Sequence, residues 1–409
     1  MSVRASLAPL QRPQLRRLLT AQFVAELADG IVTVALPLYV YARTGSASAT
    51  SWTFVVEIVA GLVLSVVGGV LADRNNRRVV LLVSYVIRGC LLAVAAAASP
   101  MWMAIGCGVL ARAMGMLDNP SFEALVPGLA EGDLQQVVGA RRFAQSASLL
   151  VGPGAGGVLV SLIGARPTLA LAGVLFLVPL ARIATMAELD ATHDQRRAIQ
   201  GPTGFRSAVS SMTDGVRLIV HHRVLRRLMI YWSLTMATVA MVIVVAIVWL
   251  DQDLDVSDAW YGLSIGAYGT GNMIGLLWAG GRRFKLSLAA IEVRAIPVYA
   301  MVAALAVAWH TPWLMLVSWF AWGAAMGPEL VVGDTVVVRA VPEELRGRAS
   351  AAQAIFLQLG MAGGYAVAGS LVDTIGARST NTVVAVMTLA LVTMWIGPYR
   401  REQRALAAG

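Results

Sequence analysis

The stretch GGVLADRNNRR, residues 68–78, places one carboxylate and three arginines directly after a long apolar run. That run, residues 51–72, is long enough to cross the roughly 30 Å hydrocarbon core of a bilayer as an α-helix. Charged groups that follow such a run are typical of the point where a membrane helix emerges into water. The stretch therefore predicts the end of a membrane-spanning helix and the start of a short loop.

The composition extends this prediction to the whole chain. Of the 409 residues, 58% are hydrophobic and 13% are charged, whereas soluble domains have about 45–50% apolar and about 25% charged residues. We predict an all-α membrane protein with twelve transmembrane helices. The apolar runs that carry this prediction lie at 17–42, 51–72, 79–98, 101–124, 137–163, 167–187, 224–249, 258–280, 287–308, 313–338, 348–373 and 379–397.

An internal repeat indicates how these helices are organised. Residues 140–168 resemble residues 352–380, and the sequence IGAR at 163–166 recurs at 375–378. The repeat aligns the fifth apolar run with the eleventh, as a six-plus-six duplication requires. We therefore expect two pseudo-symmetric six-helix bundles, residues 1–187 and 223–409, joined by a central cytoplasmic loop, residues 188–222.

The arginines predict the orientation in the membrane. They cluster before the first run, in alternate loops and at the C-terminus, whereas the other loops hold only Arg43, Arg166 and Arg378. Because basic loops stay in the cytoplasm, both termini are expected there, in a bacterial inner membrane. The net charge of +9 is then explained by topology and gives no reason to expect a nucleic-acid partner.

The opening stretch also resembles a known signature. Its pattern, Gly69-x-Leu71-Ala72-Asp73-Arg74-x-x-Arg77-Arg78, is similar to the motif of the major facilitator superfamily between its second and third helices. The resemblance implies a conformational latch made of Gly69, Asp73, Arg74, Arg77 and Arg78. The glycines allow helices to approach closely, and Asp73 is expected to face the positive N-terminal end of the eleventh helix. The alternative is an ordinary basic stop after a membrane helix.

A second motif narrows the family. Gly152-Pro153-Gly154-Ala155-Gly156-Gly157 is similar to a motif of the superfamily's drug–proton antiporters, here with Ser148 in place of its leading glycine. Gly152, Pro153, Gly156 and Gly157 would give the fifth helix a bent, smooth face for a neighbouring helix, although a simple packing face is the alternative. Other stretches resemble the twelve-helix bacterial drug exporters, a branch that includes mycobacterial multidrug pumps and the macrolide and enterobactin exporters.

Charged residues inside apolar runs are the candidates for proton coupling, because charges are costly in a membrane. Glu26 and Asp29 share one face of the first helix. Arg112 lies at a similar predicted depth in the fourth, where Leu110-Ala111-Arg112 resembles the start of the family's proton-coupling motif. We predict an Asp29–Arg112 pair in which a carboxylate binds and releases the proton, with Glu57 as a third acid. The alternative is a permanent structural pair.

The remaining candidates concern the substrate. A cavity with few acids and many apolar groups would suit amphiphilic or cationic drugs. Its candidate residues are Asp118, Met236, Met241, Glu329 and Asp334.

These observations favour a monomeric transporter that exports drug-like small molecules in exchange for protons. The chain lacks the phosphate-binding sequence G-x-x-x-x-G-K-[ST]. We therefore expect the proton gradient to drive transport, with no cofactor and no metal. Neither a catalytic constellation nor a soluble domain is evident, so we do not expect an enzyme. A lipid or siderophore exporter or flippase of the same fold is the alternative.

Overall fold

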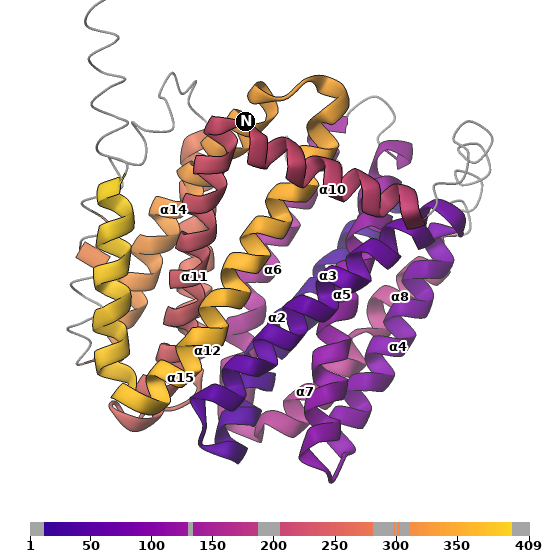
Figure 1. The fold of residues 1–409 in the computed structure, drawn as a ribbon. Coiled ribbons are helices and arrows are strands. Elements are labelled where there is room, and N and C mark those ends of the chain that lie inside the picture. The colour runs from indigo at the N-terminus through magenta and orange to yellow at the C-terminus, as the bar shows by residue number, and fades with distance from the viewer. Residues whose placement is uncertain are drawn as a thin grey trace, which may run out of the picture. The chain divides into compact units, whose positions relative to one another are not determined.

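The computed structural model describes residues 12–129, 134–186, 205–280, 298, 301–302 and 311–394, and every regular element among them is a helix. Figure 1 shows their arrangement along the chain. The α-helices are α2 (Pro13–Thr44), α3 (Ala47–Arg74), α4 (Arg77–Ala97), α5 (Met101–Leu129), α6 (Leu134–Ile163), α7 (Ala165–Leu175), α8 (Leu177–Ala184), α10 (Phe205–His221), α11 (Arg223–Gln252), α12 (Ala259–Gly280), α14 (Pro312–Ala340) and α15 (Arg346–Met394).

Nine helical segments of the described part are long and apolar enough to cross a membrane. Their side chains fit a lipid environment: Trp102 and Leu162 are 75% and 74% exposed, and only 22% of the most apolar window of α3 is buried inside the protein. In lipid, a helix is favoured because it satisfies its own backbone hydrogen bonds. The chain is therefore an all-α, multi-pass membrane protein.

Two corners of the chain have the same local structure. Gly164 precedes α7 with φ 84° and ψ 163°, and Gly376 breaks α15 with φ 80° and ψ 163°. A positive φ of this size favours glycine because a Cβ atom would be strained there. The hydroxyls of Thr168 and Thr380 donate to the carbonyls of Gly164 and Gly376, both over 2.8 Å. The repeated IGAR sequence thus forms the same helix-to-helix corner twice, and Figure 1 shows α15 as two arms.

The chain divides into two compact units. Unit 1 comprises Met1–Arg43 and Val56–Ser210, and unit 2 comprises Thr44–Val55 and Ser211–Gly409. Helix α3 belongs to both, since its first turns group with unit 2 and the remainder with unit 1.

Corresponding helices pack through glycine in each unit. In unit 1, a Cβ at Gly152 of α6 would lie 2.9 Å from the carbonyl oxygen of Leu27 in α2. In unit 2, a Cβ at Gly364 of α15 would lie 2.2 Å from the carbonyl oxygen of Ala237 in α11. Because Gly152 and Gly364 align in the sequence repeat, the duplication is also visible in helix packing.

One predicted run and the predicted central loop differ in detail from the structure. Residues 167–187, expected as one helix, form α7 and α8, which are separated at Phe176. The end of the stretch expected as a central loop contains α10, which is held against α15 by an Asp214–Arg348 ion pair of 3.4 Å. Most of the run at 287–308 lies outside the described residues.

Candidate functional site

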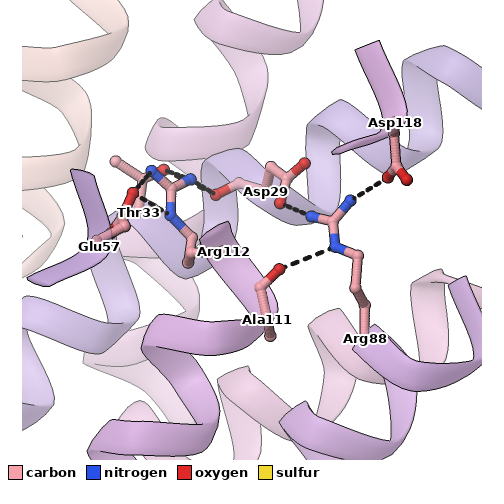
Figure 2. A network of polar contacts seen from close by, with 7 residues as sticks. All are labelled: Asp29, Thr33, Glu57, Arg88, Ala111, Arg112 and Asp118. Carbon is pink, nitrogen blue, oxygen red and sulfur yellow. Dashed lines mark hydrogen bonds and ion pairs between the residues drawn. The ribbon is translucent and has the colours of Figure 1, made fainter. Parts of the chain in front are cut away.

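Two arginines of unit 1 organise a network of polar groups contributed by four helices (Figure 2). Arg88 comes from α4 and Arg112 from α5. Around them lie Asp29 and Thr33 of α2, Glu57 of α3, and Ala111 and Asp118 of α5. Charged side chains at this depth in apolar helices need partners, because lipid and apolar side chains cannot solvate them.

Arg88 is enclosed by acceptors. Its Nη1 donates to Asp118 Oδ2 over 2.8 Å, its Nη2 donates to Asp29 Oδ1, and its Nε donates to the carbonyl oxygen of Ala111 over 3.0 Å. One guanidinium group thereby bridges two carboxylates. Its central carbon also lies 4.3 Å from the centre of the Phe176 ring, a cation–π distance. The Arg88 side chain is 2% exposed, so this charge is compensated by protein groups and not by water.

Arg112 forms the second part of the network. Its Nη2 and Nε donate to Glu57 Oε1 over 2.7 and 3.1 Å. Its Nη1 donates to the backbone carbonyl of Asp29 over 2.9 Å and to the hydroxyl of Thr33. Arg112 therefore binds α2 through neutral oxygens and α3 through a carboxylate.

The structure gives Asp29 and Arg112 different charged partners from the predicted side-chain pair. Arg112 donates to the backbone oxygen of Asp29 and pairs with the Glu57 carboxylate, while the Asp29 carboxylate pairs with Arg88. The pair was predicted because Asp29 and Arg112 lie at similar depths in their helices. The partners observed in the structure depend also on the direction in which each side chain leaves its helix. Whether Asp29, Glu57 and Arg112 participate in proton coupling stays a prediction.

Arg88 was not among the residues predicted from sequence. It is the only charged residue of α4 from Val79 to Ala97, after Arg77 and Arg78 at the start of the helix. Such a placement is itself an indication of function or of a buried ion pair. The information was present in the sequence, although the partners of Arg88 were not.

Glu26 has different neighbours from Asp29. Its Oε1 accepts from the Gln22 side chain over 2.8 Å, and the amide oxygen of Gln22 accepts from Arg141 Nε over 3.3 Å. Glu26 is therefore linked to a basic residue of α6 through one amide. Among the described residues, no group of three or more His, Cys, Asp or Glu residues could hold a metal ion.

Comparison with known proteins identifies the family of the chain. The family model of the Major Facilitator Superfamily matches residues 18–291 and 281–408. The chain belongs to the Major Facilitator Superfamily. The family consists of transporters, so the protein is a transporter and not an enzyme.

Relatives of the chain support the same assignment. It is 25% identical over 387 residues to the "Multidrug efflux pump Tap" of Mycobacterium tuberculosis and Mycobacterium bovis, covering 90% of this chain and 89% of the relative. Among solved structures it resembles the nucleoside transporter NupG, with a TM-score of 0.77, 13% identity, and 94% and 99% of the two chains covered. A POT family transporter has a TM-score of 0.67 and 10% identity, with 92% and 95% covered. The similarity to the two solved structures concerns the fold alone.

The superfamily's loop motif is described only in part. Gly68, and not Gly69, makes the close helix contact, because a Cβ at Gly68 would lie 2.9 Å from Leu117 Cα whereas a Cβ at Gly69 would meet nothing within 4 Å. Arg78 donates to the carbonyls of Ile183 and Ala184 at the end of α8 over 3.2 and 2.6 Å. Arg77 is half-buried, and the side chains of Asp73 and Arg74 lie outside the described residues. The latch role of these groups stays a prediction.

The resembled antiporter motif lies at the α2–α6 contact. A Cβ at Gly156 would lie 2.9 Å from the Ile31 carbonyl oxygen, and a Cβ at Gly30 would lie 2.9 Å from Pro153 Cδ. Gly157 is buried. Ser148, which replaces the leading glycine, donates to the carbonyl of Phe23 in α2 over 3.1 Å. The motif thus forms a packing face, while its part in transport stays a prediction.

The candidate cavity residues are divided between the two units. Asp118 lies in the Arg88 network of unit 1, whereas Met236, Met241 and Glu329 belong to unit 2. Met241 and Glu329 are 2% and 1% exposed, and Met236 is half-buried. The side chain of Asp334 lies outside the described residues.

Proposed function

We propose that this protein exports drug-like small molecules in exchange for protons by alternating access. Membership of the Major Facilitator Superfamily and similarity to a multidrug efflux pump support export of small molecules. The arginine bias among the loops supports a position in the bacterial inner membrane with both termini in the cytoplasm. The charges of the network support proton coupling.

The number of charges in the network carries the proposal. Asp29, Glu57 and Asp118 supply three carboxylates, while Arg88 and Arg112 supply two guanidinium groups. With every group ionised, these five side chains together carry one negative charge in excess. An uncompensated charge is costly in a medium of low dielectric constant. One proton removes the excess, so the network is suited to alternate between a protonated and a deprotonated form.

Asp29 is the best placed of the three acids to bind that proton. Its side chain is 26% exposed, against 14% for Glu57 and 7% for Asp118. Asp29 also shares Arg88 with Asp118. When Asp29 is neutralised, Arg88 keeps one carboxylate partner and is not left as an unpaired buried charge. Neutralising Glu57 would instead remove the carboxylate that pairs with Arg112.

The same excess charge supports cationic substrates. A cationic drug near Asp29 would supply the positive charge that the proton otherwise supplies, so binding of one would oppose binding of the other. The residues proposed to contact the substrate remain Asp118, Met236, Met241, Glu329 and Asp334. We further propose that the protein is a monomer.

Drug-dependent proton movement in proteoliposomes tests the function. Asp29→Asn is expected to abolish it while binding of a cationic drug remains measurable. Glu26→Gln, one turn away on the same helix and outside the Figure 2 network, tests the other candidate acid of α2. Loss of coupling in Glu26→Gln but not in Asp29→Asn would move the proton site to Glu26. Coupled flux that survives Asp29→Asn would contradict the assignment to Asp29. Headgroup scrambling or siderophore movement without any drug-driven proton flux would contradict drug export.

A further inference from the structure

The first turn of α3 is held by a carboxylate of α15. Asp373 Oδ1 accepts from the backbone N–H of Ala47 over 3.0 Å. Its Oδ2 accepts from the N–H of Ser48 over 3.0 Å and from the Ser46 hydroxyl over 3.1 Å. Backbone N–H groups in the first turn have no acceptor within their own helix. Asp373 therefore caps α3 from another helix.

Two further residues of α15 extend this contact along α3. A Cβ at Gly369 would lie 2.5 Å from Ser48 Cα, so only glycine permits the observed approach. The Tyr365 ring stacks on the Phe54 ring with centroids 4.4 Å apart and 11° between the planes. Residues 365, 369 and 373 are spaced by four and share one face of α15. We call these three residues and their partners on α3 the Asp373 clasp.

The helix that carries the clasp continues into unit 1. Residues Thr44–Val55 group with unit 2, and from Val56 onward the same helix belongs to unit 1. Glu57, which pairs with Arg112, lies only three residues beyond Phe54. The clasp and the Glu57–Arg112 pair therefore lie on one continuous helix, α3.

We propose that the Asp373 clasp is the outer gate latch of the transporter, closed in one state of the cycle and released in the other. The proposal rests on the proposed alternating-access function. Charge–dipole attraction and capping hydrogen bonds hold the clasp. Both are exchangeable for hydrogen bonds with water, because Asp373 is exposed. The clasp can therefore open without leaving a buried charge.

Labelling of a buried cysteine tests whether the clasp gates access. With Cys90 and Cys107 replaced by serine, Ser51→Cys places a reporter one turn into α3, where Ser51 is 1% exposed. Asp373→Ala is expected to raise its labelling by a membrane-impermeant maleimide about fivefold, the factor given by the roughly 1 kcal/mol value of an N-cap. There are two controls. Thr374→Ala removes a neighbouring hydroxyl that donates to the carbonyls of Ser370 and Leu371 within α15, and Ser257→Cys supplies a reporter at an exposed position.

The outcomes distinguish a failure of the clasp proposal from a failure of the proposed transport function. Equal labelling of Ser51→Cys in the Asp373→Ala and Thr374→Ala backgrounds would overturn the proposal, and the assay needs no drug export. If Asp373→Ala does not fold, Phe54→Cys with Tyr365→Cys keeps Asp373 and allows a short thiosulfonate cross-link. The cross-link is expected to stop export and its reduction to restore it. Export at the uncross-linked rate would show that the clasp need not open.

Discussion

Arg88 and Asp118 form an ion pair of 2.8 Å in which the side chains are only 2% and 7% exposed. Removing two charges from water is costly, and the cost is recovered only when the remaining polar atoms also find partners. Here Nε and Nη2 of Arg88 have acceptors in Ala111 and Asp29. The pair therefore joins α4 to α5 and supplies Asp29 with a fixed positive partner.

Arg88→Ala is expected to destabilise the protein by about 3–5 kcal/mol, because it leaves Asp118 as a buried carboxylate without its partner. Arg88→Lys should recover only part of the loss, since an ammonium group cannot reproduce the planar fork that serves three acceptors. Thermal unfolding in detergent measures both. Arg43→Ala, which removes an exposed arginine of α2, is the control and should change stability by less than about 0.5 kcal/mol. Equal losses at positions 43 and 88 would contradict a structural role for the buried pair.

Gly156→Leu is expected to impair folding or transport, because any side chain at this position of α6 would overlap the backbone of Ile31 in α2. Overpacking of this kind typically costs about 1–3 kcal/mol, occasionally more. Gly154→Leu offers a matched control two residues away, where a Cβ would meet nothing within 4 Å. Purified yield and export rate are the measurements. Similar losses at both positions would mean that the helix itself, and not the α2 contact, is sensitive.

The sequence predicted the fold well because lipid leaves the chain few options. Long apolar runs must form helices to satisfy their backbone, and the repeated IGAR sequence identified two corners that have nearly identical torsion angles at Gly164 and Gly376. Small differences, such as the break at Phe176, depend on local packing and have no strong sequence pattern.

The charged network was harder to predict. Asp29 and Arg112 were identified as intramembrane charges, but their pairing depends on which way each side chain leaves its helix. Glu57 extends toward Arg112 from α3, and Arg88 reaches Asp29 from α4. Position along a helix gives depth and face, whereas pairing also requires the rotation of neighbouring helices, which hydropathy does not supply.

Asp73→Asn is expected to lower export about two- to fivefold at unchanged protein level, since a charge near a helix terminus contributes about 0.3–1 kcal/mol. The prediction follows from the loop motif, in which the carboxylate favours one conformational state. Asn75→Ala, at an exposed neighbouring position, is the control. Export at the native rate by Asp73→Asn would reduce Asp73 to an ordinary loop residue.

The partner of Arg112 can be identified by a double-mutant cycle. Arg112→Gln is combined in turn with Glu57→Gln and with Asp29→Asn, and thermal stability is measured for each single and double variant. The 2.7 Å ion pair predicts a coupling energy of about 0.5–3 kcal/mol between positions 112 and 57. A smaller coupling is expected between 112 and 29, because Arg112 bonds the backbone carbonyl of Asp29, which Asp29→Asn retains.

The double variant Glu57→Gln/Arg112→Gln removes one charge of each sign, so the excess negative charge of the network persists and proton binding at Asp29 should survive. If stability is restored but drug-coupled proton flux is lost in that variant, the Glu57–Arg112 pair participates in coupling itself and the excess charge alone is not sufficient.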